Sequence, residues 1–286
     1  MPPLIQPVQM GAALVADIAA AQPEPGQIAL WWLGQSGFCI KAASATVYID
    51  LYLSEHLTTK YADTAKPHIR MTRAPLRGAD LQDVAWVFAT HKHSDHLDPG
   101  TLPDLLAANP TARLVLPQAT RDHAVSLGLD PAHLIPTRGA ETLTLDGLTV
   151  HAVPAAHPAL DHDAANGYPF LGYVFELDGV TVYHSGDTLV YEGLADQLAP
   201  HTIDIALLPI NGTSARLKAL DVPPNMNIPE ALDLAATIGA RLLIPHHYAM
   251  FTFNTADVNE FIQAAEISGQ PYHVLRCGER FVYTPA

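Results

Sequence analysis

Cysteine is scarce in this sequence, with only Cys39 and Cys277 among 286 residues. Two isolated cysteines form neither a disulfide framework nor a Cys-x-x-Cys metal site. No apolar run reaches the length needed to cross a bilayer, and no basic segment precedes the apolar N-terminal stretch. We therefore predict a cytoplasmic protein that has no membrane partner.

Basic residues are also few. Lysine and arginine together number 15 against 29 aspartates and glutamates, which gives a net charge of -14. A nucleic-acid backbone is bound by clustered basic side chains, so we expect no nucleic-acid partner. A small anionic substrate stays compatible with this charge, because bound divalent metals reverse the field around them.

Histidine, in contrast, is concentrated in one short stretch, His91-Lys92-His93-Ser94-Asp95-His96. An apolar run over residues 83–89 precedes it and is typical of a buried strand. Side chains alternate along an extended segment, so His91 and His93 point the same way and can share one metal. Asp95 and His96 diverge from that pair and are placed to serve a second metal. Two metals roughly 3.5–4 Å apart form a clamp suited to hydrolysis. A solvated, histidine-rich loop is the alternative, and the preceding strand favours the metal site.

The rest of the chain alternates strand-like and helix-like segments without repeats, which indicates one α/β domain over residues 1–286. Asp98 and Pro99 have the pattern of an N-cap and a first helical residue. Residues 52–80 look irregular, and a loop of that length is usually functional or an oligomer contact. Asp50 ends a strand and is a candidate to accept a hydrogen bond from a ligand histidine. Helices are expected over 9–21, 99–108, 118–127, 227–239 and 255–267, and strands over 28–33, 38–41, 46–50, 83–89, 112–116, 142–153 as a hairpin, 172–177, 180–184, 203–208, 241–245, 272–276 and 280–283.

The pattern His-x-His-x-Asp-His resembles the signature of the metallo-β-lactamase superfamily. Four further segments resemble the branch that contains L-ascorbate-6-phosphate lactonase. They are Trp31–Gly34, Tyr183–Asp187, Ile203–Leu207 and Ile244–His247. The resemblance implies an αββα four-layer sandwich of the α/β class, a metal-dependent hydrolase activity, a small-molecule substrate and a homo-oligomer.

The same resemblance implies the remaining metal ligands. Asp187 in His-Ser-Gly-Asp-Thr corresponds to the aspartate that bridges both metals. The last histidine is His247, with its neighbour His246 as the alternative. The third histidine of the first metal is His157, with His162 as the alternative. The implied set is then His91, His93 and His157 on one metal, Asp95, His96 and His247 on the other, and Asp187 on both.

All these ligands are nitrogen or oxygen donors, which suit two divalent ions, zinc or manganese first and iron also. Two such ions generate a bridging hydroxide that attacks a small ester, lactone or phosphorylated sugar-like substrate, with Asp95 or His96 moving the proton. Three alternatives use the same residues differently. They are a phosphodiesterase for RNA or phospholipid, a non-hydrolytic di-iron redox protein, and a scaffold with a vestigial site. The net charge disfavours the first, and His93, where the redox relatives carry a glutamate, disfavours the second.

Overall fold

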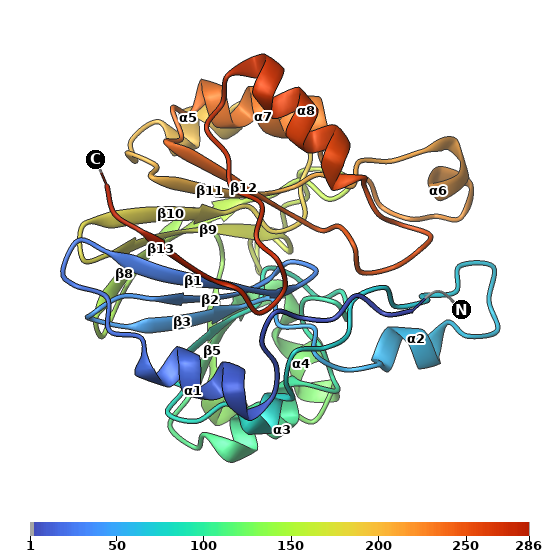
Figure 1. Cartoon of the computed structure of the whole chain (residues 1–286). Coiled ribbons are helices and arrows are strands. Elements are labelled where there is room, and N and C mark those ends of the chain that lie inside the picture. The colour runs from blue at the N-terminus through green and yellow to red at the C-terminus, as the bar shows by residue number, and fades with distance from the viewer. Residues whose placement is uncertain (1–2, 286) are drawn as a thin grey trace.

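Two β-sheets pack face to face and helices cover their outer sides, as Figure 1 shows. The structure is a computed structural model and describes residues 3–285. Aromatic rings from the two sheets meet in the middle, where the ring centroids of Phe88 and Phe175 lie 4.9 Å apart. The predicted αββα sandwich is confirmed. That one domain spans 1–286 stays a prediction.

The first sheet has seven strands, and β3, β4, β5 and β6 run parallel to one another. In spatial order it consists of β13 (Arg280–Tyr283), β1 (Ile28–Gly34), β2 (Gly37–Lys41), β3 (Thr46–Ile49), β4 (Trp86–Phe88), β5 (Arg113–Pro117) and β6 (Leu134–Thr137).

The second sheet has six strands and mixes antiparallel hairpins with a parallel portion. Its order is β12 (Leu242–His246), β11 (Ile205–Pro209), β10 (Val180–His184), β9 (Leu171–Leu177), β8 (Leu148–Pro154) and β7 (Glu141–Leu145). Both predicted Asp-Gly hairpins are present, at Asp146-Gly147 and Asp178-Gly179.

Strand β1 shows why the sheets are covered on both faces. Every residue of β1 is buried. Its alternate side chains Leu30 and Trp32 belong to the core between the sheets, whereas Trp31 and Leu33 pack on the outer helices. Because side chains alternate across a strand, a continuous apolar run places one set on each face and buries both.

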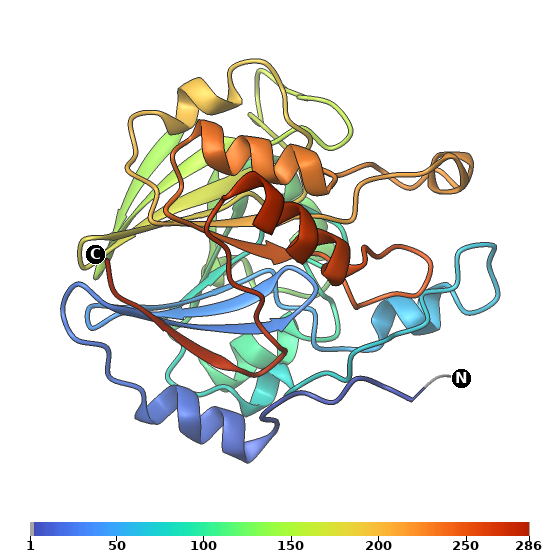
Figure 2. The ribbon, with the colours of Figure 1, turned by 45° about the horizontal axis from the view of Figure 1, so that its top comes forward.

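The helices are short. They are α1 (Ala12–Ala20), α2 (His56–Lys60), α3 (Leu102–Ala108), α4 (Arg121–Ser126), α5 (Leu194–Leu198), α6 (Ala215–Ala219), α7 (Ile228–Thr237) and α8 (Val258–Ser268), with 3₁₀ turns at Gly78–Asp80, Gln118–Thr120 and Pro131–His133. Figure 2 shows α7 and α8 lying over the second sheet. None of the helices within residues 3–285 is long and apolar enough to span a lipid bilayer.

The end of the chain returns to its beginning. Strand β13 pairs with β1 in antiparallel register, from Ile28 opposite Tyr283 to Trp31 opposite Arg280. Figures 1 and 2 both show this last strand beside the first one. The last strand of the first sheet therefore comes from residues that follow every strand of the second sheet in the chain.

The structure corrects several sequence predictions. Helix α3 begins after Thr101, so Asp98 and Pro99 are not its cap and first residue. Asp98 instead accepts hydrogen bonds from Ser54, Gly100 and Thr101, and the one from Ser54 ties the motif loop to residues 52–80. Residues 272–276 are not a strand, because only Tyr272 forms a single bridge to Leu243. Strand β6 and the helices α2, α5 and α6 are absent from the predicted elements.

Candidate metal centre

The predicted ligands gather at one end of the two facing sheets. The segment His91–His96 follows β4 of the first sheet. His157, Asp187 and His247 follow β8, β10 and β12 of the second sheet. Strand ends of an α/β fold commonly hold the functional side chains, because loops there meet at one edge.

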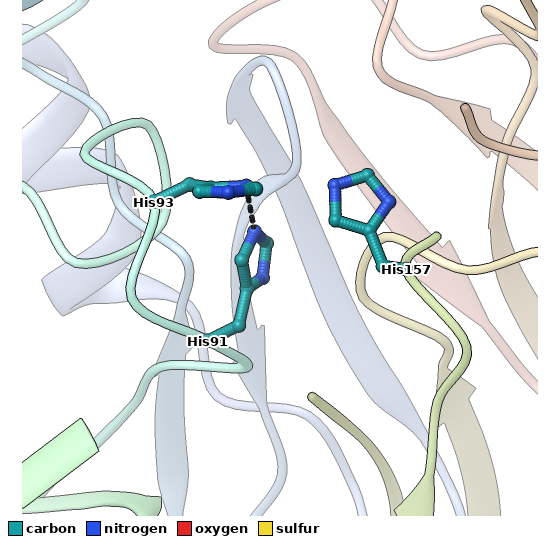
Figure 3. A group of neighbouring side chains, drawn as sticks. All are labelled: His91, His93 and His157. Atoms are coloured by element: carbon teal, nitrogen blue, oxygen red, sulfur yellow. Dashed lines mark hydrogen bonds between the residues drawn. The ribbon is translucent and has the colours of Figure 1, made fainter. Parts of the chain in front are cut away.

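One group contains three histidines, His91, His93 and His157, whose ring nitrogens lie within 4.8 Å of one another. The His91 Nε2 and His93 Nδ1 atoms are 2.8 Å apart, and the ring of His157 lies beside both (Figure 3). Burial, and then the neighbouring His157, lower the pKa of His93 to about 4. Burial and His96 hold the pKa of His91 well below its usual range. Both rings are therefore neutral at pH 7, the form in which histidine binds a metal.

A second group contains Asp95, His96 and His247. The Oδ2 atom of Asp95 lies 3.8 Å from His96 Nε2 and 3.9 Å from His247 Nε2. His96 and His247 are buried, whereas Asp95 keeps 17% of its side chain exposed. The two groups contain the same residues as the two sets that the sequence implied, and their division between two metals stays a prediction.

Asp187 lies between the two groups. Its Oδ1 atom is 3.3 Å from His96 Nε2, and its Oδ2 atom is 3.2 Å from His247 Nε2 and 3.7 Å from His157 Nε2. Burial raises the pKa of this carboxyl, but His247 and His96 together more than offset it and leave the pKa well below the usual range. A buried carboxylate that faces both groups fits a bridging role.

Neighbouring groups fix the orientation of the rings. His96 Nδ1 donates to Asp50 Oδ2 at 2.7 Å, as the position of Asp50 suggested. Thr90 donates to the same carboxylate from its amide and its hydroxyl. His157 Nδ1 donates to the carbonyl oxygen of Pro224 at 3.0 Å. With Nδ1 carrying the proton, each Nε2 presents a lone pair to the centre, which is the usual arrangement of metal-ligating histidines.

These atoms fit divalent metal ions. His96 Nε2 and Asp187 Oδ1 are both buried and lack a hydrogen-bond partner. With Nδ1 of His96 donating to Asp50, Nε2 and Oδ1 are two acceptors that face each other at 3.3 Å. Buried polar atoms rarely stay unpaired, so these two need a positive charge between them, which a bound metal ion supplies, as does a proton on His96 Nε2.

The family comparison agrees with this geometry. A model of the β-lactamase superfamily domain matches residues 47–248, a range that contains all seven predicted ligands. This chain belongs to the metallo-β-lactamase superfamily. It is a metal-dependent hydrolase of that superfamily, and the resemblance seen in the sequence is confirmed.

Similar proteins agree over most of the length. A metal-dependent hydrolase of Pyrococcus horikoshii is 30% identical over 234 residues, 80% of this chain and 88% of the relative. A probable L-ascorbate-6-phosphate lactonase of Salmonella heidelberg is 25% identical over 282 residues, 88% of this chain and 78% of the relative. Among solved structures, Igni18, a metallo hydrolase of Ignicoccus hospitalis, shares the fold with a TM-score of 0.66 and 24% identity, over 91% of this chain and all of that one.

The two alternative histidines, His162 and His246, lie outside both groups of candidate ligands. His162 is exposed and outside both groups. His246 is buried, but its ring stacks on His184 with centroids 4.9 Å apart, on the inner side of the sheet end. His247 has a positive φ of 60°, which turns the chain so that its ring meets Asp187 instead.

Gln35 is a site residue that the sequence did not reveal. Its side-chain Nε2 donates to Asp95 Oδ2 at 2.8 Å and lies 3.2 Å from His247 Nε2. Its carbonyl oxygen also accepts the backbone amide of His247. Gln35 is fully buried in the turn between β1 and β2, where it joins the two residues across the sheets. The turn pattern Gly34–Gly37 gave no sign of this contact.

The candidate ligands open onto a cleft of about 520 Å³. His93, Asp95, His157, Asp187 and His247 all line it. Residues 57–68 form one wall and residues 221–225 form part of another. The predicted functional loop 52–80 therefore contributes directly to the cleft.

Proposed function

We propose that this protein hydrolyses a small ester or lactone at a dinuclear metal centre. The observation that carries the proposal is the set of seven side chains, two groups of three joined by Asp187, at the floor of an open cleft. A volume of about 520 Å³ lies within the range of small-molecule sites. The lactone is supported by the similar protein from Salmonella heidelberg, whose name states that chemistry.

The protein groups have distinct tasks in this proposal. His91, His93 and His157 would hold one ion, Asp95, His96 and His247 the other, and Asp187 both. When bound, such ions supply a water of lowered pKa and polarise the bond to be broken. We take zinc or manganese as the metal, with iron also compatible with the donors.

Asp95 is the better placed of the two predicted proton carriers. Its side chain is partly exposed, lines the cleft and accepts a hydrogen bond from Gln35, which fixes its orientation. His96 has Nδ1 engaged by Asp50 and Nε2 turned to Asp187. As a ligand, His96 has no nitrogen left to reach a leaving group, so we assign the proton transfer to Asp95.

Elemental analysis of the protein purified without chelator tests the centre, with His93→Ala beside the wild type. We expect about two metal ions per chain in the wild type and a marked loss in the variant. The metal-loaded wild type is then assayed on neutral and phosphorylated lactones and on simple esters. A loaded protein that cleaves bis-p-nitrophenyl phosphate but no lactone or ester would overturn the substrate proposal.

We also propose that the protein forms a homo-oligomer, as the branch resemblance implies. Light scattering coupled to size exclusion measures the mass directly. A mass of 30.7 kDa, that of one chain, would contradict the oligomer without affecting the hydrolase proposal.

A further inference from the structure

Two histidines and a glutamate meet on the outer face of the second sheet, away from the candidate metal centre. They are His151 of β8, Glu176 of β9 and His201, which follows α5. One possible ligand atom from each lies within 4.8 Å of those from the other two. Figure 1 shows α5 on the same outer side of this sheet. The three residues come from separate segments, so the fold brings them together and the local sequence does not.

The alternation of side chains along the strands explains why two of these residues share a face. Phe175 packs in the core between the sheets, so its neighbour Glu176 points to the outer side. In the antiparallel register of β8 and β9, His151 is opposite Val174 and Thr149 is opposite Glu176. His151 and Glu176 are therefore diagonal neighbours on the outer face.

This group lies far from the candidate metal centre. The amide of Leu171, the first residue of β9, donates to the carbonyl oxygen of Thr90, which directly precedes His91. Glu176 lies near the other end of the strand, about 17 Å further along at about 3.4 Å per residue. The two places share no residue, so substitutions in one leave the side chains of the other in place.

The separations of the donor atoms suit a single metal ion. His151 Nε2 lies 3.1 Å and His201 Nδ1 lies 3.7 Å from Glu176 Oε1. The ligand atoms of a tetrahedral zinc ion lie roughly 3.3 Å apart, because the bonds to nitrogen and oxygen are about 2.0–2.1 Å long. The two separations lie on either side of that value. The longer one exceeds a hydrogen bond, so His201 approaches the carboxylate without donating to it.

The surroundings of the two rings also favour a bound cation. His151 Nδ1 lies 2.9 Å from Thr142 Oγ1. With Nδ1 donating to this hydroxyl, the lone pair of Nε2 faces Glu176, and a cation between these two acceptors satisfies both. Burial and then His151 lower the pKa of His201, so its ring is neutral at pH 7. The two ring centroids are 4.3 Å apart, a contact that two positively charged rings would disfavour.

We propose that His151, Glu176 and His201 bind one zinc ion, at a third site separate from the candidate metal centre. Two imidazoles and one carboxylate favour zinc over magnesium and calcium, which prefer oxygen ligands. Within residues 3–285, no lysine or arginine forms an ion pair with Glu176, so its charge is available to the ion.

The exposure of this site determines how it would behave. The side chains of His151, Glu176 and His201 are 22%, 46% and 14% exposed, so water completes the coordination and the ion exchanges with the solvent. Purification in zinc-free buffer would remove this ion. When bound, it would join β8, β9 and the segment after α5, and so stabilise this side of the second sheet against unfolding.

Equilibrium dialysis against buffered free zinc, followed by elemental analysis, counts the bound ions. We expect the wild type to bind one zinc ion more than the variant His151→Gln/His201→Gln, because the candidate metal centre is the same in both. Glu176→Gln should lose the same ion. His133→Gln is the matched control, since His133 is also half-buried and lies outside the candidate ligand groups of the described residues. Equal zinc stoichiometry in the wild type and the double variant would overturn the inference.

Urea unfolding gives a second readout that does not depend on activity. At free zinc about a hundred times the dissociation constant of this site, zinc should lower the unfolding equilibrium constant about 100-fold more in the wild type than in the double variant. Magnesium at the same concentration should give no such difference. An equal zinc-dependent gain in both proteins would refute the site. The comparison holds even if the candidate metal centre stays empty, so failure of the proposed function does not affect this test.

Discussion

The imidazole of His96 lies 2.7 Å from the carboxylate of Asp50, and both side chains are fully buried. Burial alone would lower the pKa of His96, but Asp187, Asp50 and Asp95 raise it well above the usual value. The charge of Asp50 thus supports a cation at the centre from behind the ring. Since β3 ends immediately before Asp50, the first sheet sets this contact.

Asp50→Asn should lower the affinity for the metal ions by about 10–100-fold, because it keeps the shape of the side chain and removes its charge. Competition with a chromogenic chelator measures the affinity. Asp204→Asn is the control, since Asp204 is also buried but pairs with Arg241 away from the centre. Equal metal affinity in both variants would show that Asp50 has no role in metal binding.

His157→Ala should remove metal from the first group, whereas His162→Ala should leave the metal content at the wild-type level. The reason is position, because His157 is buried beside His91 and His93 and His162 is exposed outside the group. Elemental analysis of the two variants side by side decides. Loss of metal in His162→Ala would identify His162 instead of His157 as the third histidine of the first metal.

His247→Ala should lose metal from the second group, and His246→Phe should not. Both ring nitrogens of His246 are buried without a hydrogen-bond partner, so an apolar ring there leaves no partner unpaired. The phenyl ring of the variant would also stack on His184, as the imidazole of His246 does. Metal stoichiometry is the measurement, and a depleted His246→Phe protein with a normal circular dichroism spectrum would reverse the assignment.

Gly186→Ala should destabilise the metal-free protein by about 2–4 kcal/mol. Gly186 has a φ of +61°, and an added Cβ would lie 2.7 Å from the carbonyl oxygen of Leu171 and 2.8 Å from Thr90 Cβ. Gly179→Ala is the matched control, because its φ is +84° but nothing lies within 4 Å of the added Cβ. It should cost only about 1 kcal/mol.

Urea unfolding of both glycine variants, with metal removed, gives the two free energies. A shift of the loop before Asp187 should also reduce the metal content of Gly186→Ala and not that of Gly179→Ala. If Gly186→Ala and Gly179→Ala lowered the free energy of unfolding equally, the atoms around Gly186 would have to move aside for the added Cβ without an energetic cost.

The parts of the fold that were predictable are those with local signals. Strand β1 showed an apolar run and the hairpins showed Asp-Gly turns, each within a few residues. The motif around His91 was equally local, because its ligands are neighbours in the chain. Asp187, His157 and His247 needed the family resemblance, since nothing in their own segments distinguishes them from turn or surface residues.

What could not be predicted depends on contacts between distant segments. Gln35 and Asp95 are 60 positions apart in the sequence, and the turn pattern around Gln35 does not reveal the hydrogen bond between them. Asp98 had the local pattern of a helix cap, yet its carboxylate accepts hydrogen bonds from the hydroxyls of Ser54 and Thr101. The segment near Tyr272 had strand composition, but it makes only one bridge and so forms no ladder. In each case tertiary contacts decide among local options.

The proposed ligands are divided between the two sheets, four after β4 and three after β8, β10 and β12. Ions bound there would fasten one half of the sandwich to the other. Binding restricted to the native state at about a thousand times the dissociation constant adds about 4 kcal/mol to stability. A cell short of the metal would therefore contain a protein that is both inactive and more easily degraded, so its abundance would follow the metal supply.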